Sequence, residues 1–179
     1  MAGSRRKGTA TALSDVDIEV DLSDFTKFER DLPDLVESLE PLGQMWDRLG
    51  DHRTYMLMLE GPLKVDIITD EGQDDCPPWK VSAATLPQID HHFWDWILWL
   101  GSKHLHSQED LVRRELRKMH VHLLGPLGVE TPPRDLAEAV AEYVQVRTQA
   151  ERVLRIEVDR KMEKQVRRAL RDEGVMHEH

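Results

Sequence analysis

The sequence predicts an α+β fold: a small mixed β-sheet core followed by an α-helical bundle. Strand-like alternation is found up to about residue 70, and helical spacing of apolar residues prevails after residue 88. The stretch between them is rich in Gly, Asp and Pro, as linkers are. We therefore expect a catalytic core over 1–75, a linker over 76–88, a helical domain over 89–174 and a disordered tail over 175–179.

The first strand is predicted over residues 14–20, where carboxylates and aliphatic side chains alternate with period two. The two kinds then occupy opposite faces: Asp15, Asp17 and Glu19 on one, and Val16, Ile18 and Val20 on the other. Neighbouring carboxylates repel each other, so a strand that holds them together favours a bound cation. Oxygen ligands without Cys or His indicate magnesium.

A β-hairpin is predicted downstream, because β-prone runs over 54–59 and 63–69 meet at Glu60–Leu63. Asp66 is the acidic residue of the second run, and it lies between Val65 and Ile67. Its side chain should therefore point away from the aliphatic face. We assign Asp66 as a third metal ligand.

Gly3-Ser4 followed by Ser14-Asp15-x-Asp17 on a strand resembles the signature of the nucleotidyltransferase superfamily with the polymerase-β-like fold. The resemblance implies that Gly3 and Ser4 hold the phosphates of a nucleotide, with Arg5 adding charge. It also implies that Asp15, Asp17 and Asp66 bind Mg²⁺. The alternative is a solvated strand face; the turn upstream and the acid downstream favour the metal site.

The order of motifs is most similar to the aminoglycoside adenylyltransferases, in particular the streptomycin branch. Tyr55, Asp66, Phe93-Trp94 and Lys103 stand in the order of that pattern. The resemblance implies transfer of AMP from ATP to a hydroxyl of a small polar, aminoglycoside-like acceptor, an antibiotic-resistance activity. It places Lys103 near the triphosphate; the alternative is a solvated lysine at a helix end.

Asp95 lies among Trp94, Trp96 and Trp99 on a helix that is apolar nearly all round. One interpretation is a helix buried in the bundle. The other is an aromatic wall for a sugar or cyclitol acceptor, with Asp95 either as a ligand or as the general base that takes the proton of the attacking hydroxyl.

One feature departs from the family pattern. A helix and a strand precede the Gly-Ser turn in that family, whereas Met1 and Ala2 precede Gly3 here. Either the true start lies upstream of Met1, or the core lacks these elements and another chain or element must cover the exposed edge of its sheet. Two alternatives stay open: an antitoxin-type nucleotidyltransferase that modifies a protein partner, and a catalytically inactive nucleotide-binding or regulatory module.

The amino-acid composition limits the kinds of binding partner and the cellular compartment that we expect. A formal charge of −10 over 179 residues argues against nucleic acid as a partner. The single cysteine, Cys76, excludes an internal disulfide and suits a reducing cytosol. Because no apolar stretch reaches membrane-spanning length, we expect a cytoplasmic protein without membrane contact. The family resemblance leaves a homodimer open.

Helices are predicted from apolar spacing and capping residues. The first should cover 27–39, with Pro33 in its first turn because proline lacks an N–H donor. Four more are expected in the bundle: over 89–103, over 107–124 with Gly125-Pro126 as the stop, from Asp135 with Glu138 completing a capping box, and over 159–172.

Overall fold

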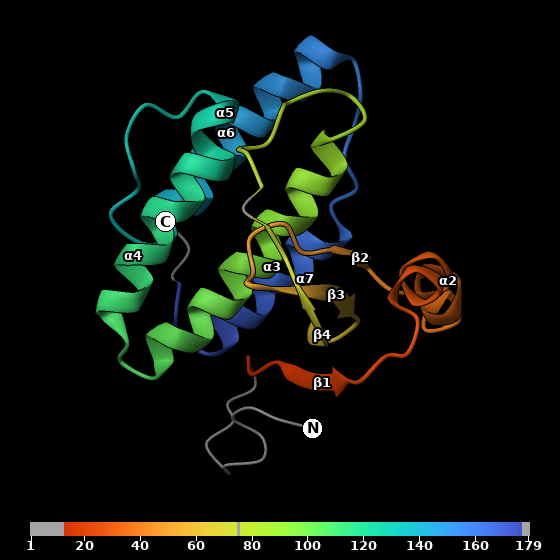
Figure 1. The fold of residues 1–179 in the computed structure, drawn as a ribbon. Helices are drawn as coiled ribbons and strands as arrows, with labels where there is room; N and C mark the ends of the chain where they lie inside the picture. Colours follow the sequence, from red (N-terminus) through yellow and green to blue (C-terminus); the bar gives the residue numbers. More distant parts are fainter. Residues whose placement is uncertain (1–12, 75, 177–179) are drawn as a thin grey trace. The chain divides into compact units, whose positions relative to one another are not determined.

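The computed structural model describes residues 13–74 and 76–176, and the chain divides into two compact units, Met1–Cys76 and Pro77–His179 (Figure 1). The predicted phosphate-binding residues Gly3, Ser4 and Arg5 lie outside the described residues. So do residues 177–179 of the expected tail. The described chain is mixed α and β, with a four-stranded mixed sheet, as the sequence predicts at this coarse level.

The sheet of the first unit has the strand order β1-β4-β3-β2. Its strands are β1 (Val16–Val20), β2 (Gly43–Trp46), β3 (His52–Leu59) and β4 (Leu63–Gly72). β1 runs parallel to β4, while β3 is antiparallel to both β4 and β2. The predicted hairpin is confirmed, with Gly61 in the turn at a φ of 112° that favours glycine. The short strand β2 was not predicted.

Helix α2 (Phe25–Glu37) begins two residues before the predicted start. Asp24 caps it, because its carboxylate accepts the backbone N–H of Lys27 at 2.9 Å. Pro33 consequently lies inside the helix, so the prediction that places it in the first turn is wrong. The cap and the buried contacts of Leu32 and Val36 hold the helix although Pro33 removes one backbone hydrogen bond.

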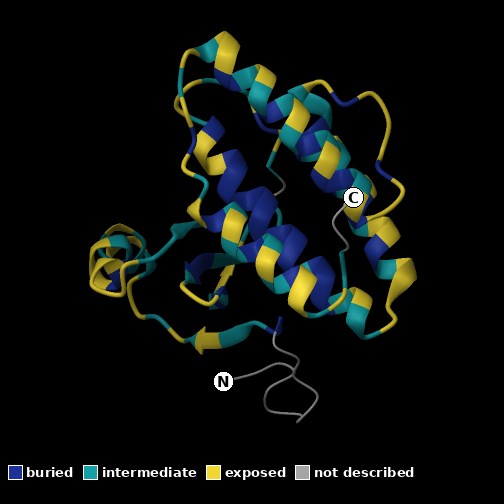
Figure 2. Ribbon diagram, turned by 180° about the vertical axis from the view of Figure 1, so that it is seen from behind, coloured by how far each residue is buried: buried dark blue, intermediate teal, exposed yellow. Residues whose placement is uncertain are grey.

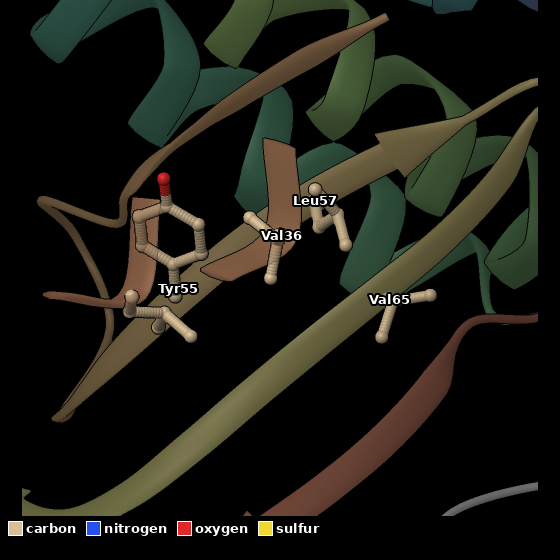
Figure 3. Packing of buried hydrophobic residues seen from close by; sticks show 5 residues of the cluster. Val36, Tyr55, Leu57 and Val65 are labelled. Carbon is tan, nitrogen blue, oxygen red and sulfur yellow. The ribbon is translucent and has the colours of Figure 1, made fainter. Parts of the chain in front are cut away.

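One face of the sheet carries the apolar core of the first unit. Leu32 and Val36 of α2 pack against Tyr55, Leu57 and Val65, which share that face through the period-two alternation of β3 and β4 (Figure 3). Residues of odd number in these strands therefore face α2. Those of even number, Asp66 among them, face the opposite side, as predicted.

The second unit is helical. Its elements are α3 (Leu86–Leu105), α4 (Glu109–Met119), the π-helical turn η1 (His120–Leu124), α5 (Gly125–Leu127), α6 (Leu136–Leu154) and α7 (Lys161–Asp172). α3 contacts α4, α6 and α7, and most of its residues are buried (Figure 2). Burial on several sides explains why its sequence is apolar nearly all round.

The predicted stop at Gly125-Pro126 is wrong. After α4 the backbone widens into η1, where the N–H of Gly125 bonds to the carbonyl of His120. Pro126 then lies at the start of α5, a position that does not require its missing N–H. The helical path ends at Gly128, which adopts a φ of 105°.

Asp135 caps α6 as predicted, accepting the backbone N–H of Glu138 at 2.9 Å. None of the described helices combines the length and the apolar character that crossing a bilayer requires.

Candidate metal centre

The candidate site lies where β1 and β4 run side by side in parallel. Their register pairs Asp17 with Asp66, flanked by the pairs Val16 with Val65 and Ile18 with Ile67. Residues paired in this way present their side chains on the same face of the sheet. Asp17 and Asp66 therefore lie next to each other on the face opposite α2.

Asp15 completes the cluster. It stands two residues before Asp17, just ahead of β1, and so reaches the same face. One carboxylate oxygen from each of Asp15, Asp17 and Asp66 lies within 4.8 Å of the others, and all three residues are half-buried. Glu19, which the alternation also places on this face, is exposed and lies outside the cluster.

Lys64 forms an ion pair with Asp66 on the same face of β4. Its ammonium Nζ donates to Asp66 Oδ1, and its side chain is only 5% exposed. The strand register sets Met58 beside Lys64 and Met56 beside Asp66, and both methionines are buried. The pair thus lies against an apolar surface, where an electrostatic interaction is stronger than in water.

The pKa of Asp66 is raised above its ordinary value, and burial is the main cause. The ammonium of Lys64 opposes this rise, whereas the negative charges of Asp15 and Asp47 add to it. The carboxylates therefore influence one another electrostatically. A divalent cation at the cluster would relieve this repulsion.

Asp47 is, with Asp15, a carboxylate whose negative charge raises the pKa of Asp66. It directly follows β2; its backbone N–H bonds to Thr54 O at 2.7 Å and its Oδ1 accepts the N–H of Leu49 at 2.9 Å. These bonds fix Asp47 in the turn between β2 and β3. Because β2 was not predicted, Asp47 was not expected to act on Asp66.

The donor set fits the predicted metal. Carboxylate oxygens are the ligands that Mg²⁺ prefers, and the cluster supplies three of them from two hydrogen-bonded strands. Within the described residues, this is the one group of His, Cys, Asp and Glu side chains close enough together to hold a metal ion. Asp15, Asp17 and Asp66 are thus brought together as the sequence predicts.

The other predicted site residues, Asp95 and Lys103, belong to α3 in the second unit. Asp95 is buried in the helix bundle. The ammonium of Lys103 lies 4.8 Å from the centroid of the Trp99 ring, a cation–π contact. The roles proposed for both toward the nucleotide and the acceptor stay predictions.

Sequence reasoning missed Lys64, although the signal was present. A residue two positions before Asp66 on a strand must share its face, and a lysine there can reach the carboxylate.

Comparison of the chain with protein-family models, curated proteins and solved structures finds no match.

Proposed function

We propose that this protein is a magnesium-dependent nucleotidyltransferase that transfers AMP from ATP to a hydroxyl of a small polar acceptor of the aminoglycoside type. The observation that carries the proposal is the convergence of Asp15, Asp17 and Asp66 to within 4.8 Å. The sequence motif predicts this convergence from two separate segments. Asp15 and Asp17 come from an Asp-x-Asp strand, and Asp66 from the second strand of a hairpin.

The reaction forms a bond between the acceptor oxygen and the α-phosphorus of ATP. The bond from the α-phosphorus to the bridging oxygen breaks, and pyrophosphate leaves with the electron pair. Bound Mg²⁺ would supply charge neutralisation for the triphosphate and the developing negative charge. The three aspartates would hold it, and the rigid pairing of β1 with β4 keeps their oxygens in place without reorganisation.

The acceptor hydroxyl must lose its proton during this transfer, and Asp95 is the base proposed from sequence. The acidic character of the chain, with a net charge of −10, favours a cationic acceptor.

The direct test is pyrophosphate release from ATP and Mg²⁺, measured with a panel of aminoglycosides and other cyclitols. Asp17→Asn should lower the rate by roughly 100-fold or more, because it removes a charge that the transition state requires. Glu19→Gln is the matched control: it removes a carboxylate from the same strand but outside the cluster. It should retain the wild-type rate within about twofold.

Three results contradict the proposal. Equal loss in both variants would show that the carboxylates act only through general charge, and release that persists in Asp17→Asn would assign the activity to a contaminant. Finally, the protein could bind ATP in a metal-dependent way yet release no pyrophosphate with any small acceptor or protein partner. That result would instead indicate a regulatory module.

A further inference from the structure

Lys64 lies beside the three proposed metal ligands but has no role in the proposed transfer reaction. It is the most deeply buried lysine among the described residues, and its ammonium contacts one of the three carboxylates. Lysine is rarely buried to this extent unless it is paired, because removing its charge from water is unfavourable. Its place is therefore explained by Asp66.

We propose that Lys64 is an internal counter-ion of the metal site: it holds Asp66 when the metal is absent and competes with the metal for that carboxylate. The inference rests on the proposed function. It assigns to this chain a residue that keeps the affinity for the free divalent ion low.

The competition follows from the contact between Lys64 Nζ and Asp66 Oδ1. An oxygen that accepts a hydrogen bond from an ammonium is a poorer ligand for a second cation. The two positive charges also repel each other across a short distance on a surface lined by Met56 and Met58, where water screens little. Binding of the metal therefore requires Lys64 to release Asp66 or to share it.

The consequence concerns how the metal is loaded. A site in which a tethered ammonium opposes the free ion takes it up best when additional negative ligands arrive with it. A triphosphate supplies such ligands and gives the released ammonium a new partner. Lys64 should thus make binding of metal and nucleotide mutually dependent.

The test is calorimetric titration of Mn²⁺, a spectroscopically useful substitute for Mg²⁺, into the wild type and into Lys64→Met. Methionine keeps an unbranched side chain of nearly the same length, one heavy atom shorter than lysine, and carries no charge. The variant should bind free Mn²⁺ at least about tenfold more tightly than the wild type, since the repulsion is gone. Lys64→Arg keeps the charge and should bind like the wild type.

Thermal unfolding gives a second readout that does not depend on activity. In EDTA, Lys64→Met should melt below the wild type, because Asp66 is left beside an apolar surface without its cation. Mn²⁺ should then raise its melting temperature by more than it raises that of the wild type. The double variant Lys64→Met with Asp66→Asn should lose this extra response.

Lys64→Gln is the second single variant; it removes the charge but retains a hydrogen-bond donor for Asp66, should Lys64→Met fold poorly. Equal Mn²⁺ affinity in the wild type and the charge-removing variants would overturn the inference while leaving the proposed function intact. Absence of Mn²⁺ binding from every form would overturn both. Binding by the variants but not by the wild type would support the role of Lys64 as a competitor.

Discussion

Each unit contains a cluster of charged side chains, and the two clusters differ in how positive and negative charges are arranged. In the first unit, three carboxylates gather at the join of β1 and β4, with Lys64 on one of them. In the second unit, opposite charges alternate: Asp90 meets Arg147 at 2.8 Å, and Arg147 meets Glu163 at 2.7 Å. The like charges of the first cluster would be stabilised by a bound cation. In the second cluster, each charge is paired with one of opposite sign.

The charged groups of the second cluster find their ionic partners within the bundle. Oδ1 of Asp90 accepts hydrogen bonds from the hydroxyl of Tyr143 at 2.6 Å, from Arg147 and from the indole of Trp94 at 3.3 Å. Arg147 is 2% exposed and Asp90 4%. These bonds tie α3 to α6 and, through Glu163, to α7. The Asp90 cluster therefore serves stability, whereas the Asp66 cluster is the one that we propose binds a cation.

The largest effect should come from Arg147→Met. Loss of the guanidinium leaves Asp90 and Glu163 without their shared cation, and breaking a buried pair in this way costs about 3–5 kcal/mol of unfolding free energy. Urea unfolding measures it. Arg168→Met is the control, because Arg168 is 79% exposed and pairs with Asp172 at 3.6 Å; its loss should cost about 1 kcal/mol or less. Similar losses in the two variants would contradict a stabilising role for the Asp90 cluster.

A smaller effect should distinguish two tyrosines. Tyr143→Phe removes a donor to a carboxylate and should cost about 1.5–3 kcal/mol, whereas hydrogen bonds between neutral groups contribute about 0.5–1.5 kcal/mol. Tyr55→Phe tests the second case, because the Tyr55 hydroxyl donates to Gln44 at 3.0 Å in the first unit. Chemical unfolding of both variants gives the order. The reverse order would show that the hydroxyl of Tyr143 contributes little to the Asp90 cluster.

The smallest effect concerns pH. Burial raises the pKa of Asp90 above its ordinary value of 3.8, although Tyr143 and Arg147 oppose the rise. The folded state therefore holds this proton more tightly than the unfolded state does. Its contribution to stability is present below pH 3.8 and is lost as pH rises through the folded pKa. In unfolding curves between pH 4 and 8, the stability of the wild type relative to Asp90→Asn should fall as pH rises. A wild type that instead gains stability relative to Asp90→Asn with rising pH would contradict this.

Patterns between residues close together in the sequence predicted parts of the structure, whereas contacts between residues far apart in the sequence were not predicted. Local alternation and a hairpin, both short-range signals, could place Asp17 and Asp66 each on a face of its strand, whereas their meeting across β1 and β4 was expected only from the family resemblance. The Asp90 cluster could not be placed in this way, because its partners Tyr143 and Arg147 lie 53 and 57 residues away along the chain. Pro33 was misplaced since tertiary contacts of Leu32 and Val36 outweigh a local helix rule.

Two residues near the three aspartates, Asp47 and Lys64, were not predicted as part of the candidate site. Asp47 depends on β2, a four-residue strand too short to carry a periodic signal. Lys64 shares the alternation that identified Asp66, so its position was predictable although its ion pair was not. Long-range contacts decide which of the residues on a face meet.

The measurement that tests the central claim most directly is paramagnetic broadening of backbone amide resonances by substoichiometric Mn²⁺. If Asp15, Asp17 and Asp66 hold a divalent cation, broadening should be strongest at residues 15–17, where the chain enters β1, and at residues 65–67 of β4, and Asp17→Asn should abolish it. Strongest broadening elsewhere, or the same pattern in Asp17→Asn, would contradict the account.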